Sequence, residues 1–273
     1  MADSPYLKYQ TIRYKSGEKS ELMDAITVEK ALQISINGSS FSVVMQTPGD
    51  EVNLTRGLLF SEDIITQDTI VQFETSHSKD GYIEKVNCII SEENLGEGFK
   101  SSRSLLSVSS CGICGKQELS DINTSGSRLS KNELKPGFIF KLQEIMQSSQ
   151  PIFPITGSTH GSALFNKKGD LLTLKEDIGR HNALDKTIGD FILNHSSSFS
   201  DKILIVSSRV SFEVVQKTIM AGIPVLIAVG APSDLAITTA KRFNLTLIGF
   251  TSKRSFNVYH GDHRLTPIKK ELS

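Results

Sequence analysis

The sequence predicts a mixed α/β (α+β) fold, with a β-rich N-terminal part ahead of a C-terminal domain in which strands and helices alternate. Three short apolar runs lie in the last third of the chain, at 203–206, 224–229 and 245–250. Segments with helical spacing separate them, and apolar strands that alternate with helices are typical of a parallel sheet covered on both faces. Residues 27–46 instead alternate between apolar and polar side chains, as half-buried strands do. We divide the chain into a β-rich region over 1–120, a linker with a helix over 121–150, and an α/β domain over 151–273.

The N-terminal part is expected to begin with two strands around a polar turn. The strands fall at 32–36 and 41–45, because β-branched residues are enriched there and Asn37-Gly38-Ser39-Ser40 has the chemistry of a hairpin turn. A helix is expected over 51–60, where the leucines share one face. Two further strands are predicted, at 70–76 and 82–91.

The middle and C-terminal elements follow from spacing and from helix-capping residues. Residues 120–130 are rich in Ser, Gly and Asn, which predicts a mobile loop, and residues 138–149 have helical spacing. Ser211 can cap a helix that Gly222 ends, and Ser233 can cap a second helix that runs to about residue 243.

Composition limits the classes of protein that this chain can belong to. Thirty basic and thirty acidic residues cancel, so no net charge draws it to nucleic acid or to a membrane surface. No apolar run approaches the roughly 20 residues that span a bilayer, and the N-terminus lacks the apolar core of a signal peptide. Three cysteines without a disulfide pattern suit a reducing compartment. We expect a soluble, cytoplasmic protein with neither a nucleic acid nor a membrane as partner.

The most informative motif is a lone CxxC, formed by Cys111 and Cys114 in the sequence CGICGK. The flanking glycines leave room for a reaction partner, and a nearby cation would raise the fraction of thiolate. A structural zinc site would need a second pair of ligands. The third cysteine, Cys88, lies in an apolar run and is predicted to be a buried strand residue. The motif therefore favours reactive sulfur, with no metal site.

Three polar segments are expected to meet at one edge of the C-terminal sheet, because ligands of open α/β sheets gather beyond the carboxyl ends of the strands. These segments are 207–209, 230–233 and 251–254. They offer hydroxyls, backbone N–H groups at helix starts, and the cations Arg209, Lys253 and Arg254, which suit a phosphate. The alternative is that the serines are ordinary helix caps and that the cations form a solvated surface.

Two histidine segments are further candidates for a binding site. His160 lies among small residues, and His181 follows Arg180 in the first turn of a predicted helix. Cations there oppose the helix dipole, which indicates pairing with an anionic ligand. The alternative for each histidine is a hydrogen-bonded, partly buried side chain.

Six ordered blocks together resemble the FdhD/NarQ family. They are the SCGICGK motif, TGSTH at 156–160, EDIGRHNALDK at 176–186, SSRVSFE at 207–213, AGIPV at 221–225 and LIGF at 247–250. A weaker seventh block is the TPGD sequence at 47–50. The match runs in the same order from about residue 26 to about residue 265.

The resemblance implies an accessory sulfurtransferase for formate dehydrogenase. Such a protein accepts persulfide sulfur from a cysteine desulfurase. It passes the sulfur to molybdenum bis(molybdopterin guanine dinucleotide) before this cofactor enters the apo formate dehydrogenase. The resemblance further implies a cytidine-deaminase-like, three-layer C-terminal domain, a smaller N-terminal domain and a homodimer.

Site residues follow from the same resemblance. Cys111 is the implied persulfide carrier, while Cys114 relays the sulfur, resolves the persulfide or tunes Cys111. The family segment that contacts the guanine dinucleotide matches Phe250, Thr251, Ser252, Lys253, Arg254 and Ser255. The expected cofactor site also includes Arg209, His160, Asp177 and His181. Asp177 or Glu176 is a candidate acceptor for a guanine edge, and GDP is the expected mimic of the cofactor.

Three other functions compete with this one. A zinc deaminase needs a His-x-Glu ahead of its cysteines, and none precedes Cys111. A thioredoxin-like CxxC should open a helix after a first strand, whereas this motif lies past residue 110 among glycines. A cofactor-binding chaperone without sulfur chemistry would keep the anion-binding edge and would not need the cysteines, so it stays the main alternative.

Overall fold

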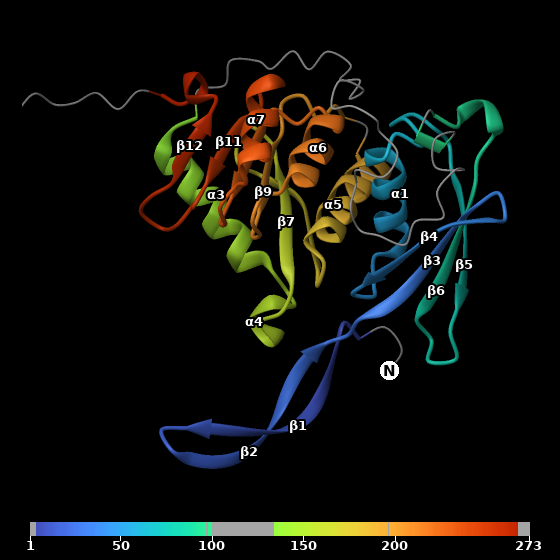
Figure 1. Ribbon diagram of the computed structural model, residues 1–273, viewed down its shortest axis with the longest axis vertical. Coiled ribbons are helices and arrows are strands. Elements are labelled where there is room, and N and C mark those ends of the chain that lie inside the picture. The colour runs from blue at the N-terminus through green and yellow to red at the C-terminus, as the bar shows by residue number, and fades with distance from the viewer. Residues whose placement is uncertain (1–3, 97, 100–133, 196, 267–273) are drawn as a thin grey trace, which may run out of the picture.

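The computed structural model describes residues 4–96, 98–99, 134–195 and 197–266, which form three β-sheets and the helices that cover them (Figure 1). In the C-terminal part, a six-stranded sheet has the order β12-β11-β10-β9-β7-β8. Its strands are β7 (His160–Phe165), β8 (Leu171–Asp177), β9 (Ile203–Val206), β10 (Val225–Ala228), β11 (Thr246–Gly249) and β12 (Asn257–His260). Strands β9, β10 and β11 are parallel, as predicted, while β7 runs antiparallel to β9.

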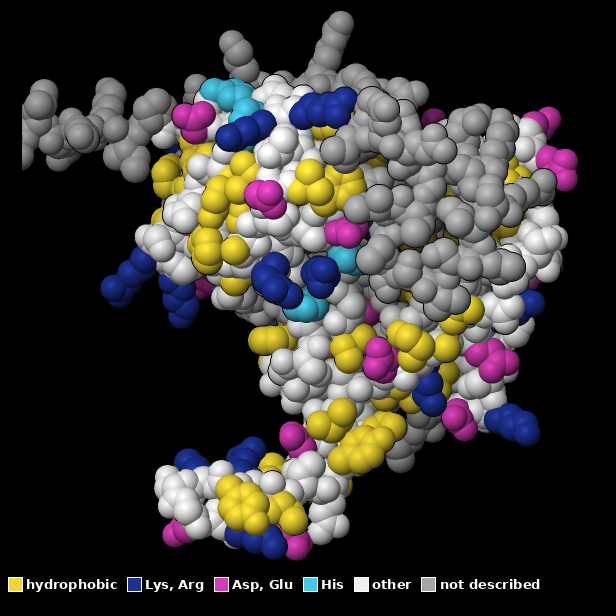
Figure 2. All heavy atoms as spheres, viewed as in Figure 1, with side chains coloured by type: hydrophobic (Ala, Val, Ile, Leu, Met, Phe, Trp, Pro, Cys, Tyr) yellow, Lys and Arg dark blue, Asp and Glu magenta, His cyan; other side chains and the backbone are white. Residues whose placement is uncertain are grey.

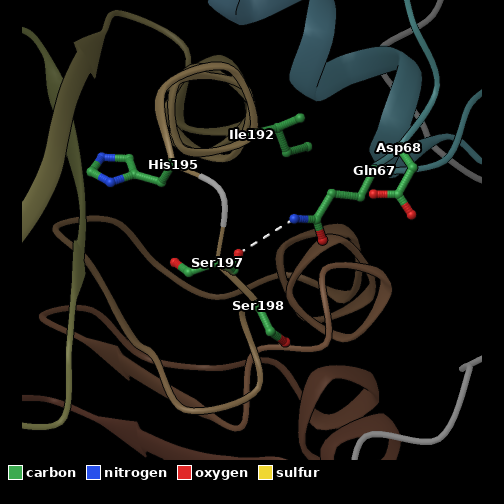
Figure 3. Close-up of a pocket in the computed structure, with 6 residues that line it drawn as sticks. All are labelled: Gln67, Asp68, Ile192, His195, Ser197 and Ser198. Atoms are coloured by element: carbon green, nitrogen blue, oxygen red, sulfur yellow. Dashed lines mark hydrogen bonds between the residues drawn. The ribbon is translucent and has the colours of Figure 1, made fainter.

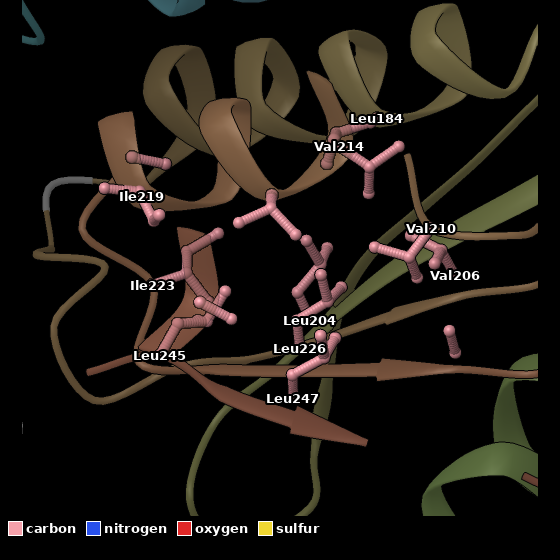
Figure 4. Close-up of a cluster of buried hydrophobic side chains, with 14 of the residues drawn as sticks. Leu184, Leu204, Val206, Val210, Val214, Ile219, Ile223, Leu226, Leu245 and Leu247 are labelled. Carbon is pink, nitrogen blue, oxygen red and sulfur yellow. The ribbon is translucent and has the colours of Figure 1, made fainter. Parts of the chain in front are cut away.

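Helices cover both faces of this sheet, which gives three layers. On one face lie α5 (Arg180–Asn194), α6 (Phe212–Met220) and α7 (Asp234–Arg242), and on the other lies α3 (Pro136–Ser149). Successive strand residues face opposite layers. Leu204 and Leu226 pack against α5 and α6, as Figure 4 shows, whereas Ile205 and Ile227 pack against α3. This double burial explains the near-continuous apolar strands in the sequence.

The N-terminal part contains a four-stranded sheet with the order β4-β3-β6-β5. Its strands are β3 (Lys30–Ile36), β4 (Ser39–Gln46), β5 (Gln72–His77) and β6 (Ile83–Ile89). The turn between β3 and β4 has positive φ at Asn37 and Gly38, the geometry of a tight hairpin turn. Helix α1 (Glu51–Ser61) covers one face of the sheet. The two predicted strands around this turn, the helix and the two later strands are all confirmed.

A two-stranded hairpin was not predicted. Strands β1 (Tyr6–Lys15) and β2 (Glu18–Thr27) pair antiparallel along their whole length. The hairpin projects away from the rest of the molecule (Figure 1). Short elements complete the fold: α4 (Phe153–Thr156) and the 3₁₀ turns η1 (Glu92–Asn94) and η3 (Asp262–Arg264).

Helix α1 joins the two larger sheets, because it packs against α5 as well as against its own sheet. The two helices cross at a pair of glycines. A Cβ atom at Gly57 would lie 1.9 Å from the carbonyl oxygen of Asp185, and one at Gly189 would lie 1.9 Å from that of Asn53. Only glycine permits so close an approach of the two backbones. The division of the chain at residues 120 and 150 stays a prediction, since residues 100–133 lie outside the described ranges.

Candidate functional site

The three polar segments predicted to converge do meet beyond the ends of β9, β10 and β11. The amide of Gly230 donates to Ser208 O at 3.2 Å, and the amide of Phe250 donates to Gly230 O at 3.2 Å. The amide of Val210 donates to Ala231 O at 3.0 Å. We call this side of the six-stranded sheet the carboxyl edge.

Phe250 stands at the carboxyl edge in a strained conformation. Its φ is 51°, in the left-handed region that bulky side chains avoid, and its side chain is 52 % exposed. Strain of this kind costs about 1–3 kcal/mol and clusters at functional sites. Here it turns an aromatic ring toward solvent beside the polar loops, where a base could stack on it.

The rest of the predicted 250–255 segment forms a tight turn. The amide of Ser252 donates to Ser255 O at 2.8 Å, and the two serine hydroxyls lie 3.0 Å apart. Lys253 and Arg254 are exposed, and neither forms an ion pair with a described residue. Thr251 is buried, and its carbonyl accepts a hydrogen bond from Gln143 Nε2 at 3.1 Å. The segment therefore presents two cations and two hydroxyls, with Thr251 beneath them.

His160 reaches the same edge because β7 is antiparallel to β9. The amino end of β7 thus lies next to the carboxyl end of β9, where the amide of Gly161 donates to Ser207 Oγ at 2.9 Å. His160 is paired with Asp177, the last residue of β8, and α5 begins three residues later. This topology brings His160, Arg180 and His181 together with Arg209, and Figure 2 shows basic side chains beside histidines near the middle of this face.

The site is positively charged, and its histidines are neutral at pH 7. Burial lowers the pKa of His160, and Arg180 and Arg209 lower it further. Burial also lowers the pKa of His181 to about 4, with Arg180 and Lys217 adding to the effect. Neither arginine forms an ion pair with a described residue. Two guanidinium groups that have no carboxylate partner among residues 4–96, 98–99, 134–195 and 197–266 suit an anionic ligand.

The two predicted helix caps behave differently. Ser233 caps α7, accepting a hydrogen bond from the amide of Ala236 at 3.2 Å. Ser211 begins α6, but its hydroxyl makes no capping bond and lies 3.3 Å from His181 Nε2. Glu213 is also near, with Oε2 at 4.0 Å from the same nitrogen. Ser211 therefore belongs to the surroundings of His181.

Asp177 does not fit the expected contact with a guanine edge, because its carboxylate is fully buried and both of its oxygens accept hydrogen bonds from the protein. Oδ2 accepts from the amide of Thr47 at 2.9 Å and from Lys186 Nζ at 2.8 Å. Oδ1 accepts from the amide of Gly179 at 2.7 Å and from Asn182 Nδ2 at 3.1 Å. Asp177 thus links the start of α5 to the segment that follows β4. It thereby helps to position Arg180 and His181 in the first turn of α5.

Glu176, the other candidate for that contact, is buried as well. Its carboxylate accepts hydrogen bonds from the amides of Ile152 and Phe153, at 2.6 and 2.9 Å. It also accepts from Gln150 Nε2 at 2.9 Å and from Thr159 Oγ1 at 2.7 Å. Glu176 therefore holds the segment that leads into β7, and both of its carboxylate oxygens already accept hydrogen bonds there.

Arg180 and Lys186 belong to the site but were not among the predicted site residues. Arg180 had a signal in the sequence, a cation in the first turn of a helix. Lys186 had a weaker one, a lysine between the apolar positions Leu184 and Ile188 of α5. It is buried and donates to Thr47 O at 2.5 Å as well as to Asp177.

The cysteine motif itself, Cys111 and Cys114, lies outside the described residues. Cys88 is on β6 and fully buried, as predicted, and burial raises the pKa of its thiol to about 12. A thiol with so high a pKa is unreactive at neutral pH. Across the described ranges, no three His, Cys, Asp or Glu side chains are grouped so that they could hold a metal ion.

A separate cavity of about 390 Å³ lies near the far end of α5, between Gln67, Asp68, Ile192, His195, Ser197 and Ser198 (Figure 3). One hydrogen bond joins its walls, from Gln67 Nε2 to Ser197 O at 3.4 Å. Helix α5 rises about 1.5 Å per residue, so this cavity lies about 20 Å from Arg180. It takes no part in the carboxyl edge.

The model of the FdhD/NarQ family matches residues 27–266. This chain belongs to that family. It is 36 % identical to the sulfur carrier protein FdhD of Streptomyces avermitilis, with 94 % of each chain covered. It is 38 % identical to the protein of the same name from Picrophilus torridus, covering 96 % of this chain and 99 % of that one.

The fold of this FdhD/NarQ member also matches a crystal structure, that of a candidate formate dehydrogenase accessory protein from Desulfotalea psychrophila. The TM-score is 0.76 at 21 % identity, covering 96 % of this chain and 100 % of the other. The mixed α/β architecture predicted from the sequence is confirmed. Among the described helices, none has both the length and the apolar character needed to cross a membrane.

Proposed function

We propose that this protein takes persulfide sulfur from a cysteine desulfurase and transfers it to molybdenum bis(molybdopterin guanine dinucleotide). It would thereby support the activity of formate dehydrogenase. The observation that carries the proposal is a pair of guanidinium groups at the carboxyl edge, Arg180 and Arg209, which form no ion pair within the described part of a chain whose relatives are named sulfur carriers. A cofactor with two pyrophosphates matches that charge.

In the first step, the Cys111 thiolate attacks the outer sulfur of the desulfurase persulfide. The bond between the two sulfurs of the donor breaks, the donor cysteine leaves as a thiolate, and a persulfide forms on Cys111. The sulfur–sulfur bond of this persulfide then breaks, Cys111 leaves as a thiolate, and the outer sulfur takes two electrons from the reduced form of the cofactor that accepts it as sulfide. Cys88 takes no part, because its thiol is buried and protonated.

The carboxyl edge would hold the nucleotide part of this substrate. Arg209, Arg180 and the turn at 252–255 offer cations and N–H groups to the pyrophosphates. The exposed ring of Phe250 offers a surface on which guanine can stack. GDP should bind at the same place as a simple mimic.

Intact-protein mass spectrometry tests the sulfur step. Wild type, Cys111→Ala and Cys114→Ala are incubated with a cysteine desulfurase and cysteine, with Cys88→Ala as the matched control. We expect a gain of one sulfur in wild type, Cys114→Ala and Cys88→Ala, and none in Cys111→Ala. If no variant gains sulfur while GDP still binds, the protein is a cofactor chaperone, since nucleotide binding would then occur without sulfur chemistry.

Calorimetric titration with GDP tests the nucleotide site. Arg209→Ala should weaken binding at least tenfold, since a charge-assisted hydrogen bond contributes about 1.5–3 kcal/mol. Lys168→Ala, which removes an exposed lysine of the β7–β8 turn, is the control and should bind as wild type does. Equal affinities in all three proteins would remove the carboxyl edge from the proposal.

The proposal also includes partners and a location. A cysteine desulfurase would donate the sulfur, and an apo formate dehydrogenase would receive the sulfurated cofactor. A protein that carries a reactive thiol is suited to the reducing cytoplasm, and the family resemblance implies a homodimer.

A further inference from the structure

At the sheet edge opposite the carboxyl edge, four basic or titratable side chains gather where β11 begins. Lys241 lies in the last turn of α7, His260 ends β12, and His263 and Arg264 belong to η3. We call these four residues the amino-edge cluster. Figure 2 shows histidines beside Lys or Arg side chains at the top of the molecule, next to where Figure 1 draws α7 and β12. Strand β11 has four residues at about 3.3 Å each, so the two edges lie about 13 Å apart.

Arg264 is buried without a carboxylate partner in the described part of the chain. It is 2 % exposed, and its Nη1 donates to a neutral group, Thr246 Oγ1, at 2.6 Å. Its Nε has no hydrogen-bond partner among the described residues. Burial lowers the pKa of this guanidinium, yet an arginine stays charged at neutral pH. Because buried charges in proteins are paired, Arg264 calls for an anion from outside the described chain.

The side chains near Arg264 are themselves basic. Burial lowers the pKa of His260, and His263 and Arg264 lower it further. Lys241 lowers that pKa as well, so all four groups of the cluster lie within electrostatic reach of one another. The rings of His260 and His263 are 6.4 Å apart, and His260 Nε2 is a second buried nitrogen without a partner in the described ranges. Asp262 is an acidic neighbour, but it is exposed and forms no ion pair with a described residue.

The turn that carries Arg264 is fixed against the start of β11. Gly261 has a φ of 80°, and a Cβ atom there would overlap the hydroxyl of Thr246, so only glycine permits this approach. The amide of Leu134 donates to Arg264 O at 2.7 Å, and the amide of Arg264 donates to Gly261 O at 3.1 Å. The dipole of α7 accounts for Lys241 in its last turn, since helix ends of this kind favour cations. It does not account for a buried arginine on a neighbouring turn.

We propose that the amino-edge cluster binds an oxyanion of the phosphate class, at a site separate from the nucleotide site proposed at the carboxyl edge. Arg264 supplies a buried charge on a fixed backbone, and a guanidinium group matches the geometry of phosphate. Lys241 and His263 are exposed beside it and meet the anion from solvent. The anion would neutralise Arg264, and salt screens such a partly buried interaction only weakly. Free phosphate and a phosphate group of a larger molecule share this chemistry.

Titration with inorganic phosphate at constant pH, followed by NMR of the histidine rings, tests the site directly. In wild type, the signals of His260 and His263 should shift and saturate, and His263→Gln identifies the second of them. Lys241→Gln should raise the phosphate concentration at half-saturation roughly fivefold or more, because a unit charge beside the anion is lost. Lys79→Gln, the same change at an exposed lysine of the β5–β6 turn, is the control and should titrate as wild type does. Equal half-saturation in Lys241→Gln and wild type overturns the proposal.

Further titrations separate phosphate from other anions. Sodium chloride at matched ionic strength should leave the histidine signals in place; shifts equal to those with phosphate would be salt screening and would overturn the proposal. A response to citrate without one to phosphate would overturn the phosphate assignment. Glycerol 3-phosphate separates the two sources. Tighter binding than that of inorganic phosphate supports a phosphate group on a larger molecule, and equal or weaker binding supports free phosphate.

Arg264→Met tests the buried charge. It removes a charge that has no partner in the described chain, so folding should survive. Phosphate should then no longer shift the His263 signal, and a shift of wild-type size in the folded variant overturns the role of Arg264. If this variant does not fold, Lys241→Gln and Lys79→Gln still decide between the outcomes. Because these signals are read separately from GDP binding and from sulfur loading, failure here leaves the proposed function intact.

Discussion

Removing the amine of Lys217 should destabilise the protein strongly, because this lysine is buried in an ion pair where three helices meet. Nζ lies 3.0 and 2.9 Å from the two carboxylate oxygens of Asp185 on α5. It also lies 2.7 Å from Ser61 Oγ on α1 and 3.2 Å from Glu62 Oε1. Asp185 is 1 % exposed, so in Lys217→Met its carboxylate would keep only the Ser61 hydroxyl, at 2.9 Å.

Breaking a buried pair by removing one partner costs about 3–5 kcal/mol. For a chain of this size, that loss lowers Tm by about 10 °C. The double variant Asp185→Leu/Lys217→Met should regain most of the loss, because apolar residues of similar volume can replace a buried pair at little cost. Thermal and urea unfolding of wild type, Lys217→Met and the double variant measure the loss of stability and its recovery.

The loss should also depend on pH. Burial raises the pKa of Asp185 even with Lys217 present, and removal of the amine raises it further. With the folded pKa above the unfolded one, folded Lys217→Met binds more protons than its unfolded chain between these values. Its free energy of unfolding should therefore rise from about pH 8 to about pH 5 relative to wild type. A Tm within about 2 °C of wild type, or a loss equal at both pH values, would refute the reasoning.

Three further predictions concern single residues. Gly57→Ala should cost at least about 2 kcal/mol in unfolding free energy, since its Cβ would lie 1.9 Å from Asp185 O, whereas Gly137→Ala, with open space around it, should cost nothing. In NMR titrations, the His181 ring should protonate near pH 4, and a midpoint near its ordinary value of about 6.5 would contradict the burial described above. Phe250→Ala should weaken GDP binding about tenfold through lost stacking while Tm stays unchanged; full affinity would rule out a base on this ring.

Local signals in the sequence predicted most of the fold. The turn at Asn37 and Gly38 and the buried strands β9, β10 and β11 each carry their own pattern of residues. The β1–β2 hairpin was missed because its apolar residues fall on both faces, so no alternation of period two marks it. The crossing of α1 and α5 was missed as well, because the contact between their glycines depends on elements far apart in the chain.

The candidate site was predicted in part, for the same physical reason. Convergence of the loops after three parallel strands follows from topology alone, so Arg209, Lys253 and Arg254 could be assigned to one edge, whereas Phe250 entered the site through the family resemblance. Burial is a property of the whole fold. The sequence therefore could not show that the carboxylates of Asp177 and Glu176 are hydrogen-bonded to neighbouring backbone amides and side chains. Nor could it show that β7 runs antiparallel to β9, which is what brings His160 to this edge.

Because the thiol of Cys88 is buried, its reactivity can report local unfolding of the protein. The chain has three cysteines, so in a Cys111→Ser/Cys114→Ser protein every alkylation event would report exposure of strand β6. When reclosing is faster than alkylation, the labelling rate gives the free energy of opening at that strand. An opening free energy equal to that of global unfolding would mean that both large sheets melt as one cooperative unit. A smaller value would mean that the four-stranded sheet opens locally while the carboxyl edge stays folded.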